Sequence, residues 1–124
     1  MGLHECLRDY LGEWITPLRN KAFDTEAQRY LIEEMNDEAQ AVDCRFESGP
    51  PIRLHYWRFN HVIELLREAQ GEYIMIGSSL NPEHTDTIEG SLMNEAVEKE
   101  YPHAGVMTAP FVCDFIVLYG YAEY

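Results

Sequence analysis

The chain has 124 residues and a formal net charge of −13, from 22 acidic and 9 basic side chains. Apolar residues make up 46 % and charged residues 25 %, which is close to an ordinary globular domain and argues against global disorder. A surface this negative repels nucleic acid and anionic lipid, so we expect direct binding to neither nucleic acid nor membrane. The length favours one domain over residues 1–124 that needs no disulfide or metal to fold.

The negative charge is concentrated in two segments. Residues 24–50 carry a net charge of −6 and residues 72–124 a net charge of −8, whereas residues 1–23 are neutral and residues 51–71 carry +1. Fixed negative charge attracts cationic proteins over about one Debye length, roughly 8 Å in physiological salt. The sequence therefore predicts a protein partner with a basic surface.

The first segment predicts a helix. Apolar residues from Leu3 to Leu18 recur at steps of three and four, which is typical of a helix of about five turns. Pro17 is expected to end it near Thr16. The segment lacks the basic start and apolar core of a signal peptide, and the longest apolar stretch, Phe115 to Tyr119, is far below the ~20 residues that cross a bilayer. We therefore expect a cytoplasmic protein, in the host cytoplasm if it is viral.

A second helix is predicted over residues 25–42. Thr25 and Gln28 have the spacing of a capping box at its start. Like charges four residues apart in this segment would each cost about a few tenths of a kcal/mol of helix stability, so local stability does not favour them. The carboxylates that we expect to face a partner are Glu26, Glu33, Glu34, Asp37 and Glu38.

Two strands are predicted next. Apolar and polar residues alternate over residues 42–46 and again over residues 52–57, and Ser48–Pro51 between them is a strong turn signal. On the second strand, Arg53, His55 and Trp57 would share the face opposite the core, and an exposed Trp beside Arg is typical of a protein interface. One long helix over residues 52–70 is an alternative to this strand, and Trp57 packed beneath a helix is an alternative to its exposure.

The remaining elements complete an α+β pattern. We expect a short helix over residues 60–69 with Asn60 as its N-cap, a strand at Tyr73–Ile76, a helix that begins at Ser91, and a central strand over residues 111–121. Strands and helices thus interleave irregularly. This order predicts an α+β fold, with a small, mostly antiparallel sheet of about four strands and helices packed on one face.

No combination of residues identifies a reaction. The sequence has no G-x-S-x-G elbow, and we expect no catalytic residue, no metal and no cofactor. His61, close to a predicted helix start, is interpreted as a polar surface group. An alternative hypothesis is a small-ligand or metal-dependent enzyme that uses Ser79, His84 and Asp86 in the loop at residues 77–90. Another is a homo-oligomeric structural or assembly protein, and the sequence leaves the oligomeric state open.

The favoured hypothesis is a non-enzymatic protein-binding module. Carboxylates spaced along a helix imitate a row of backbone phosphates, and a nucleic-acid-binding complex would then accept this chain in its basic groove. In this profile, small, acidic and without a catalytic motif, the chain is similar to virus-encoded inhibitors of bacterial defence, such as anti-CRISPR and anti-restriction proteins. The resemblance implies an inhibitor that acts by nucleic-acid mimicry.

Overall fold

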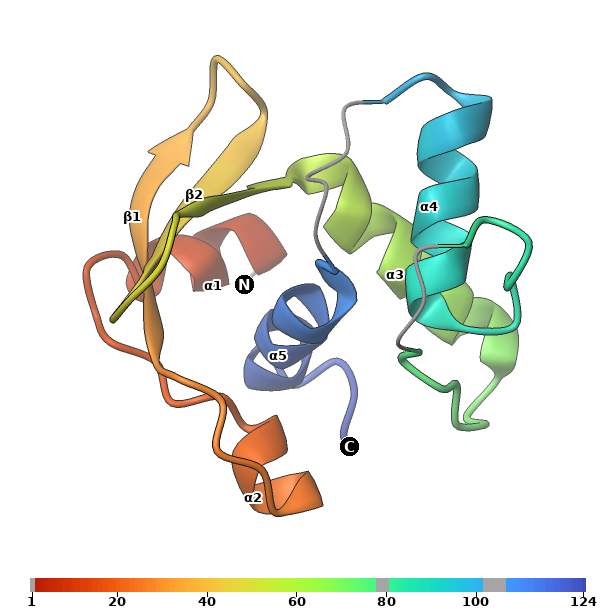
Figure 1. Ribbon diagram of the computed structural model, residues 1–124, viewed down its shortest axis with the longest axis horizontal. Coiled ribbons are helices and arrows are strands. Elements are labelled where there is room, and N and C mark those ends of the chain that lie inside the picture. The colour runs from red at the N-terminus through yellow and green to blue at the C-terminus, as the bar shows by residue number, and fades with distance from the viewer. Residues whose placement is uncertain (1, 78–80, 102–106) are drawn as a thin grey trace. The chain divides into compact units, whose positions relative to one another are not determined.

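The computed structural model describes residues 2–77, 81–101 and 107–124 (Figure 1). The chain forms two compact units, Met1–Tyr56 together with Asp114–Tyr124, and Trp57–Cys113. The first unit is discontinuous in sequence, because the chain leaves it after Tyr56 and returns at Asp114. The expectation of one domain over residues 1–124 stays a prediction.

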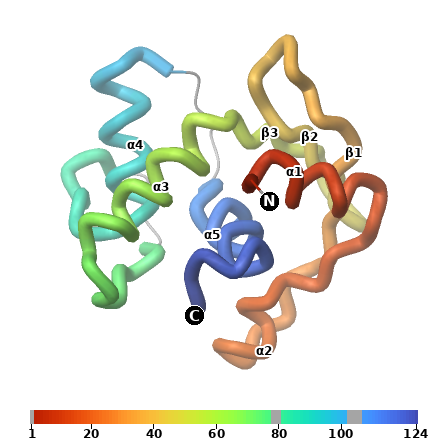
Figure 2. The backbone as a smooth tube through the Cα atoms, turned by 180° about the vertical axis from the view of Figure 1, so that it is seen from behind, coloured from red at the N-terminus to blue at the C-terminus, as the bar shows by residue number. Residues whose placement is uncertain are grey.

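The first unit is built on an antiparallel sheet with the strand order β1-β2-β3. Val42 pairs with Leu54 and Cys44 with Ile52, which confirms the hairpin expected around the Ser48–Pro51 turn. Figures 1 and 2, which view the chain from opposite sides, show the first helix lying across one face of this sheet. The elements of the unit before the return of the chain are α1 (Leu3–Asp9), α2 (Arg19–Phe23), β1 (Tyr30–Asn36), β2 (Ala41–Phe46) and β3 (Ile52–His55).

The helix predicted over residues 25–42 is wrong, because this segment contains strand β1. Thr25, the expected start of a capping box, does not cap a helix. Its hydroxyl donates to the side-chain oxygen of Asn20 at 3.0 Å, and the Ala27 amide donates to the same oxygen at 2.9 Å. These bonds fold the chain back after α2. The apolar residues that follow then join a sheet, where long-range pairing outweighs the weak helical preference of the segment.

The helix predicted over Leu3 to Leu18 is also too long. α1 ends at Asp9, and the chain then runs along the free edge of β1. The Gly12 amide donates to the Ile32 carbonyl at 2.9 Å, and Ile15 exchanges two backbone hydrogen bonds with Tyr30. The later apolar residues of the periodic stripe therefore cover a strand edge, which satisfies backbone groups that would otherwise be unpaired.

The interior of the first unit is apolar where the sheet meets α1 and the returning chain. At the start of β1 three successive residues are buried, so both faces of the strand are covered there. The buried apolar side chains of the unit include Cys6, Leu7, Ile15, Tyr30, Leu31, Ile32, Ala41, Val42, Cys44, Leu54, Phe115 and Ile116.

The second unit is helical in its described part. It contains most of α3 (Tyr56–Ala69), all of α4 (Ile88–Glu98) and the first half of α5 (Ala109–Leu118). α3 begins four residues before the predicted N-cap Asn60, directly after β3, so the segment is a strand followed by a helix. The strand predicted at Tyr73–Ile76 reduces to a single bridge between Met75 and Thr87.

α4 begins before the predicted start at Ser91. The Thr87 hydroxyl oxygen accepts from the Gly90 amide at 3.1 Å and so caps the helix. The carbonyls of Met75 and Ile76 accept from the amides of Ile88 and Glu89, both at 2.9 Å. The first turn of α4 is therefore fastened to the preceding loop.

The central strand predicted over residues 111–121 is wrong, because residues 109–118 form helix α5. Every residue from Val112 to Ile116 is buried. A helix buried on all sides shows no polar face, so its periodicity cannot be distinguished from that of a central strand. The described part of the chain consequently has a three-stranded sheet in place of the expected four, within a fold that is α+β as expected. Helix packing on one face stays a prediction.

Candidate functional site

The five predicted partner-binding carboxylates are all exposed, but they do not lie on a helix. Glu33 and Glu34 belong to β1, Asp37 and Glu38 form the turn between β1 and β2, and Glu26 precedes β1. We call the four carboxylates from Glu33 to Glu38 the acidic hairpin. The structure thus brings these four together and leaves Glu26 seven residues before the first of them.

Two residues of the acidic hairpin are paired within the first unit. Glu33 Oε1 lies 3.3 Å from Arg45 Nε, and Asp37 Oδ1 lies 3.6 Å from His4 Nε2. The Tyr56 hydroxyl also donates to Asp37 Oδ1 at 3.1 Å. Burial, followed by this hydrogen bond to Asp37, raises the pKa of Tyr56 above its usual value. Asp37 is therefore fixed in position although it is exposed.

The other two residues of the hairpin have no such partner. Among the residues that the structure describes, no Lys, Arg or His nitrogen lies within 4.0 Å of a carboxylate oxygen of Glu34 or Glu38. Glu33 and Glu34 stand at an irregularity in the ladder, because Ile32 pairs with Cys44 and Glu34 pairs with the adjacent Asp43. Such a bulge turns both carboxylates toward solvent on neighbouring positions.

The predicted strip of Arg53, His55 and Trp57 is not a single face. Arg53 is exposed on β3, and its Nε donates to Asp43 Oδ1 at 2.7 Å. This hydrogen bond lowers the pKa of Asp43 below its usual value. His55 is half-buried at the end of β3. The arginine is thus already engaged by a carboxylate of the same sheet.

Trp57 lies on α3 in the second unit, not on the predicted strand. Its ring stacks on Tyr101 with centroids 4.8 Å apart, and the Arg58 guanidinium carbon lies 4.6 Å from the indole centroid. Trp57 is half-buried. These contacts make Trp57 a packing residue of the second unit, and its packing beneath a helix stays a prediction.

An arginine–aromatic cluster does occur in the first unit, at a position that the sequence did not indicate. Trp14 is 41 % exposed, and the guanidinium carbons of Arg29 and Arg45 lie 5.6 Å and 5.5 Å from its ring centroid. Arg29 also pairs with Glu47 and Arg45 with Glu33. We call these five residues the Trp14 cluster. Only the pairing of the Leu11–Ile15 segment with β1 brings Trp14 to these arginines, and no sequence pattern shows that pairing.

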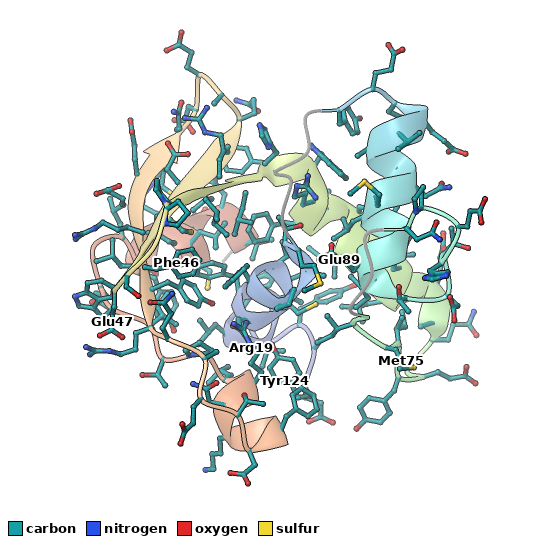
Figure 3. All side chains as sticks on the ribbon, viewed as in Figure 1. Arg19, Phe46, Glu47, Met75, Glu89 and Tyr124 are labelled. Atoms are coloured by element: carbon teal, nitrogen blue, oxygen red, sulfur yellow. The ribbon has the colours of Figure 1, made fainter. Side chains whose placement is uncertain are left out.

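A buried polar cluster lies where the chain returns to the first unit. Asp114 is fully buried and accepts hydrogen bonds from Arg19, from the Tyr124 hydroxyl and, at 3.0 Å, from the Tyr30 hydroxyl. Figure 3 shows Arg19 and Tyr124 close together beside α5. Burial raises the pKa of Asp114, and burial together with the Asp114 carboxylate raises the pKa of Tyr30 well above its usual value. These hydrogen bonds connect α2, β1 and α5, so we assign the cluster a structural role.

The second unit contains a histidine cluster that sequence reasoning also missed. His61 on α3 lies with Nε2 2.9 Å from Ser91 Oγ and with Nδ1 3.6 Å from Glu95 Oε2. Lys99 Nζ lies 2.7 Å from Glu95 Oε1. We call these four residues the His61 cluster. His61 was interpreted as a surface group, but it is half-buried, and burial lowers its pKa below the usual 6.5.

Two buried charged side chains of the second unit, Glu89 and Arg58, each hydrogen-bond to the chain at the start of α5. Glu89, only 2 % exposed, accepts from the Ala109 amide at 3.2 Å and so caps the first turn of α5 (Figure 3). Arg58 Nη1 donates to the Thr108 hydroxyl at 3.0 Å. Burial raises the pKa of Glu89 above its usual value. Both groups serve to hold α5 in place.

The structure adds no support for an active site in the loop at residues 77–90. His84 and Asp86 are exposed, and Ser79 lies outside the described residues. Within residues 2–77, 81–101 and 107–124, no three His, Cys, Asp or Glu side chains gather as a metal-binding group. The hypothesis of a site at residues 77–90 stays untested.

Comparisons with protein-family models, with curated proteins and with solved structures gave no match to this chain. In the described ranges, no helix has both the length and the apolar character needed to cross a membrane.

Proposed function

We propose that this chain is a protein-binding module whose acidic hairpin contacts a basic protein surface. The partner class is a nucleic-acid-binding protein or complex with a groove lined by Lys and Arg, which the hairpin carboxylates occupy in place of phosphates. Such a module acts as an inhibitor by exclusion, and its proposed setting is the cytoplasm of a cell in which that complex works, the host cytoplasm if the chain is viral.

The observation that supports this proposal is the state of the hairpin carboxylates. Glu34 and Glu38 are exposed, have no ion pair in the described part of the chain, and stand beside Glu33 and Asp37 in a chain of net charge −13. Exposed carboxylates gathered in one place strengthen the local negative potential, which speeds association with a cationic surface. The same charge repels phosphates, which argues against nucleic acid as the ligand.

The hairpin is also held in shape before a partner binds. The side-chain oxygen of Asn36 accepts from the Ala39 amide at 2.9 Å, and the Gln40 amide donates to the Asp37 carbonyl at 3.2 Å. The Tyr56 hydroxyl fixes the Asp37 side chain. A preorganised surface loses less conformational entropy on association, so more of the contact energy remains as affinity.

The Trp14 cluster is a second contact candidate for the same partner. The ion pair between Glu33 and Arg45 connects it to the acidic hairpin. Trp and Arg are enriched among the residues that dominate protein interfaces. If a part of the binding resists high salt, it is attributed to this cluster, and Trp14→Ala is expected to remove that part.

Charge reversal tests the proposal directly. Glu34→Lys with Glu38→Lys changes two hairpin carboxylates that hold no ion pair, so the fold is expected to persist. Glu72→Lys with Glu123→Lys is the matched control, because both residues are exposed and lie outside the hairpin. Each double variant adds four charge units and moves the net charge from −13 to −9. Immobilised wild type and both variants are incubated with bacterial lysate at low and high salt, and captured proteins are quantified by mass spectrometry.

The expected result is a nucleic-acid-binding protein that wild type and control retain and the hairpin variant loses. Salt is expected to elute it, since exposed charges are screened. If both double variants lose the partner equally, only the net charge of the chain matters. If both retain it equally, the partner binds outside the acidic hairpin. Either result contradicts the proposal, provided that circular dichroism shows both variants to be folded.

A further inference from the structure

The His61 cluster has the arrangement of a serine nucleophile with its base. Ser91 Oγ lies 2.9 Å from His61 Nε2, which is hydrogen-bonding distance. On the other side of the ring, Glu95 Oε2 lies 3.6 Å from Nδ1, within ion-pair range but longer than a hydrogen bond. A nucleophile, a base and a carboxylate behind the base thus follow one another in line, which is the pattern of an activated serine.

Rigid elements hold these groups. Ser91 and Glu95 are four residues apart on α4 and therefore share one face of that helix, and His61 meets both from α3. Thr87 caps α4, and the loop carbonyl of His84 packs closely on Gly90, the residue before Ser91. Sites on well-fixed helices keep reacting groups in register better than loop sites do.

The ring is set to accept a proton from Ser91. Burial is the largest influence on His61 and lowers its pKa, so the imidazole is neutral near pH 7. Glu95 beside Nδ1 favours the tautomer with its proton on Nδ1, which leaves the Nε2 lone pair facing Ser91 Oγ. Among the charged neighbours, Glu95 and Glu68 raise this pKa and Lys99 lowers it.

We propose that Ser91 is a nucleophile that accepts the acyl group of small activated esters, with His61 as general base and Glu95 as positioning residue. Ser91 Oγ forms a bond to the ester carbonyl carbon while its proton passes to His61 Nε2. The bond between that carbon and the leaving oxygen then breaks, and the leaving group takes the proton from His61. A water molecule reverses the sequence: it attacks acyl-Ser91, gives its proton to His61, and the acid departs as Ser91 recovers that proton.

The surroundings of Ser91 define the substrate class. Ser91 is only 9 % exposed, so the acyl group must be small. The amides of Ile88, Glu89, Gly90 and Ser91 already donate to Met75, Ile76 and Thr87, so the first turn of α4 offers no pair of amides to an oxyanion. Losing one oxyanion donor costs an enzyme about 10²–10³ in rate. We therefore expect reaction with esters of good leaving groups and none with amides.

This site belongs to the second unit and the acidic hairpin to the first, so the two proposals stand independently. The probe is 4-nitrophenyl acetate, added to the full chain at pH 7.5. The expected result is release of one equivalent of 4-nitrophenol in a burst, an intact mass increased by one acetyl group, and that group located on Ser91 by peptide mapping. Ser91→Ala is expected to remove the burst and the label. Ser48→Ala, an exposed serine that contacts Gln28 and no histidine, is the matched control and is expected to retain both.

His61→Gln gives a second route if Ser91→Ala fails to fold. Loss of the general base is expected to slow acetylation of Ser91 by about 100-fold. The role of Glu95 is tested by the pH profile of acetylation. Glu95→Gln is expected to move its inflection to lower pH and Lys99→Met to higher pH, because the two charges act on His61 in opposite directions. A merely structural contact would not give opposite shifts.

The proposal is overturned if folded wild type carries the acetyl group on another side chain only, or if Ser91 stays unmodified. It is also overturned if folded His61→Gln acetylates Ser91 at the wild-type rate. None of these results depends on the partner of the acidic hairpin, so failure here leaves the proposed function untouched.

Discussion

Asp114 shows how one residue holds the first unit together. Its carboxylate is fully buried and accepts hydrogen bonds from Arg19, Tyr30 and Tyr124. A buried carboxylate is costly unless it is paired, and here three donors offset that cost. Removing it would take a shared acceptor away from the buried Tyr30 hydroxyl and from Arg19 and Tyr124, which are half-buried.

Asp114→Ala is therefore expected to lower the free energy of unfolding by about 3–5 kcal/mol, the usual loss when one partner of a buried charged pair is removed. Urea denaturation monitored by circular dichroism measures it. Asp43→Ala, which removes the carboxylate of the more exposed pair with Arg53, is the control and is expected to lower stability much less. Similar losses in the two variants would show that the Asp114 contacts contribute no more than a surface pair.

Among the helices and strands, the sequence predicted those in which apolar and polar residues alternate clearly along the chain. β2 and β3 alternate clearly and are joined by a strong turn, so their hairpin was foreseen. β1 was mistaken for a helix because residues after α2 are held by Asn20 rather than by a helix cap, and because the partner at its outer edge is distant in sequence. α5 was mistaken for a strand because all residues from Val112 to Ile116 are buried. Tertiary contacts decided both cases.

The contact between α4 and its preceding loop gives a prediction at this scale. A Cβ atom on Gly90 would lie 1.9 Å from the carbonyl oxygen of His84, so the helix and the loop approach closely only because residue 90 is glycine. Gly90→Ala must push the loop away, and overpacking of this kind costs about 1–3 kcal/mol.

Thermal denaturation measures that cost, with Gly2→Ala as the control, since no atom lies within 4 Å of a Cβ at Gly2. The expected outcome is a lower melting temperature for Gly90→Ala and a smaller change for Gly2→Ala, which only replaces the N-cap of α1. If both variants melt like wild type, the loop does not rest on α4 as described.

For the molecule as a whole, the distribution of charge was the sequence feature that best predicted the candidate site. The carboxylates of the acidic hairpin were selected from sequence, although on the wrong secondary structure, because net charge is independent of fold. The Trp14 and His61 clusters were not foreseen. Trp14 is brought to its arginines by strand pairing, and His61 meets Ser91, thirty residues further along the chain, and Glu95 beyond it. Contacts between distant segments leave no periodic signal.

Hydrogen–deuterium exchange of the chain, free and with its captured partner, shows whether the acidic hairpin is the surface that binds the partner. Partner binding is predicted to slow exchange in residues 33–40, where the four carboxylates lie, and to leave residues 71–77 unchanged. In the latter loop, Tyr73 is 81 % exposed and Met75 is 73 % exposed, so this loop is the competing contact surface. Figure 3 labels Met75 in it. Protection confined to residues 71–77, with residues 33–40 exchanging as in the free chain, would contradict the account.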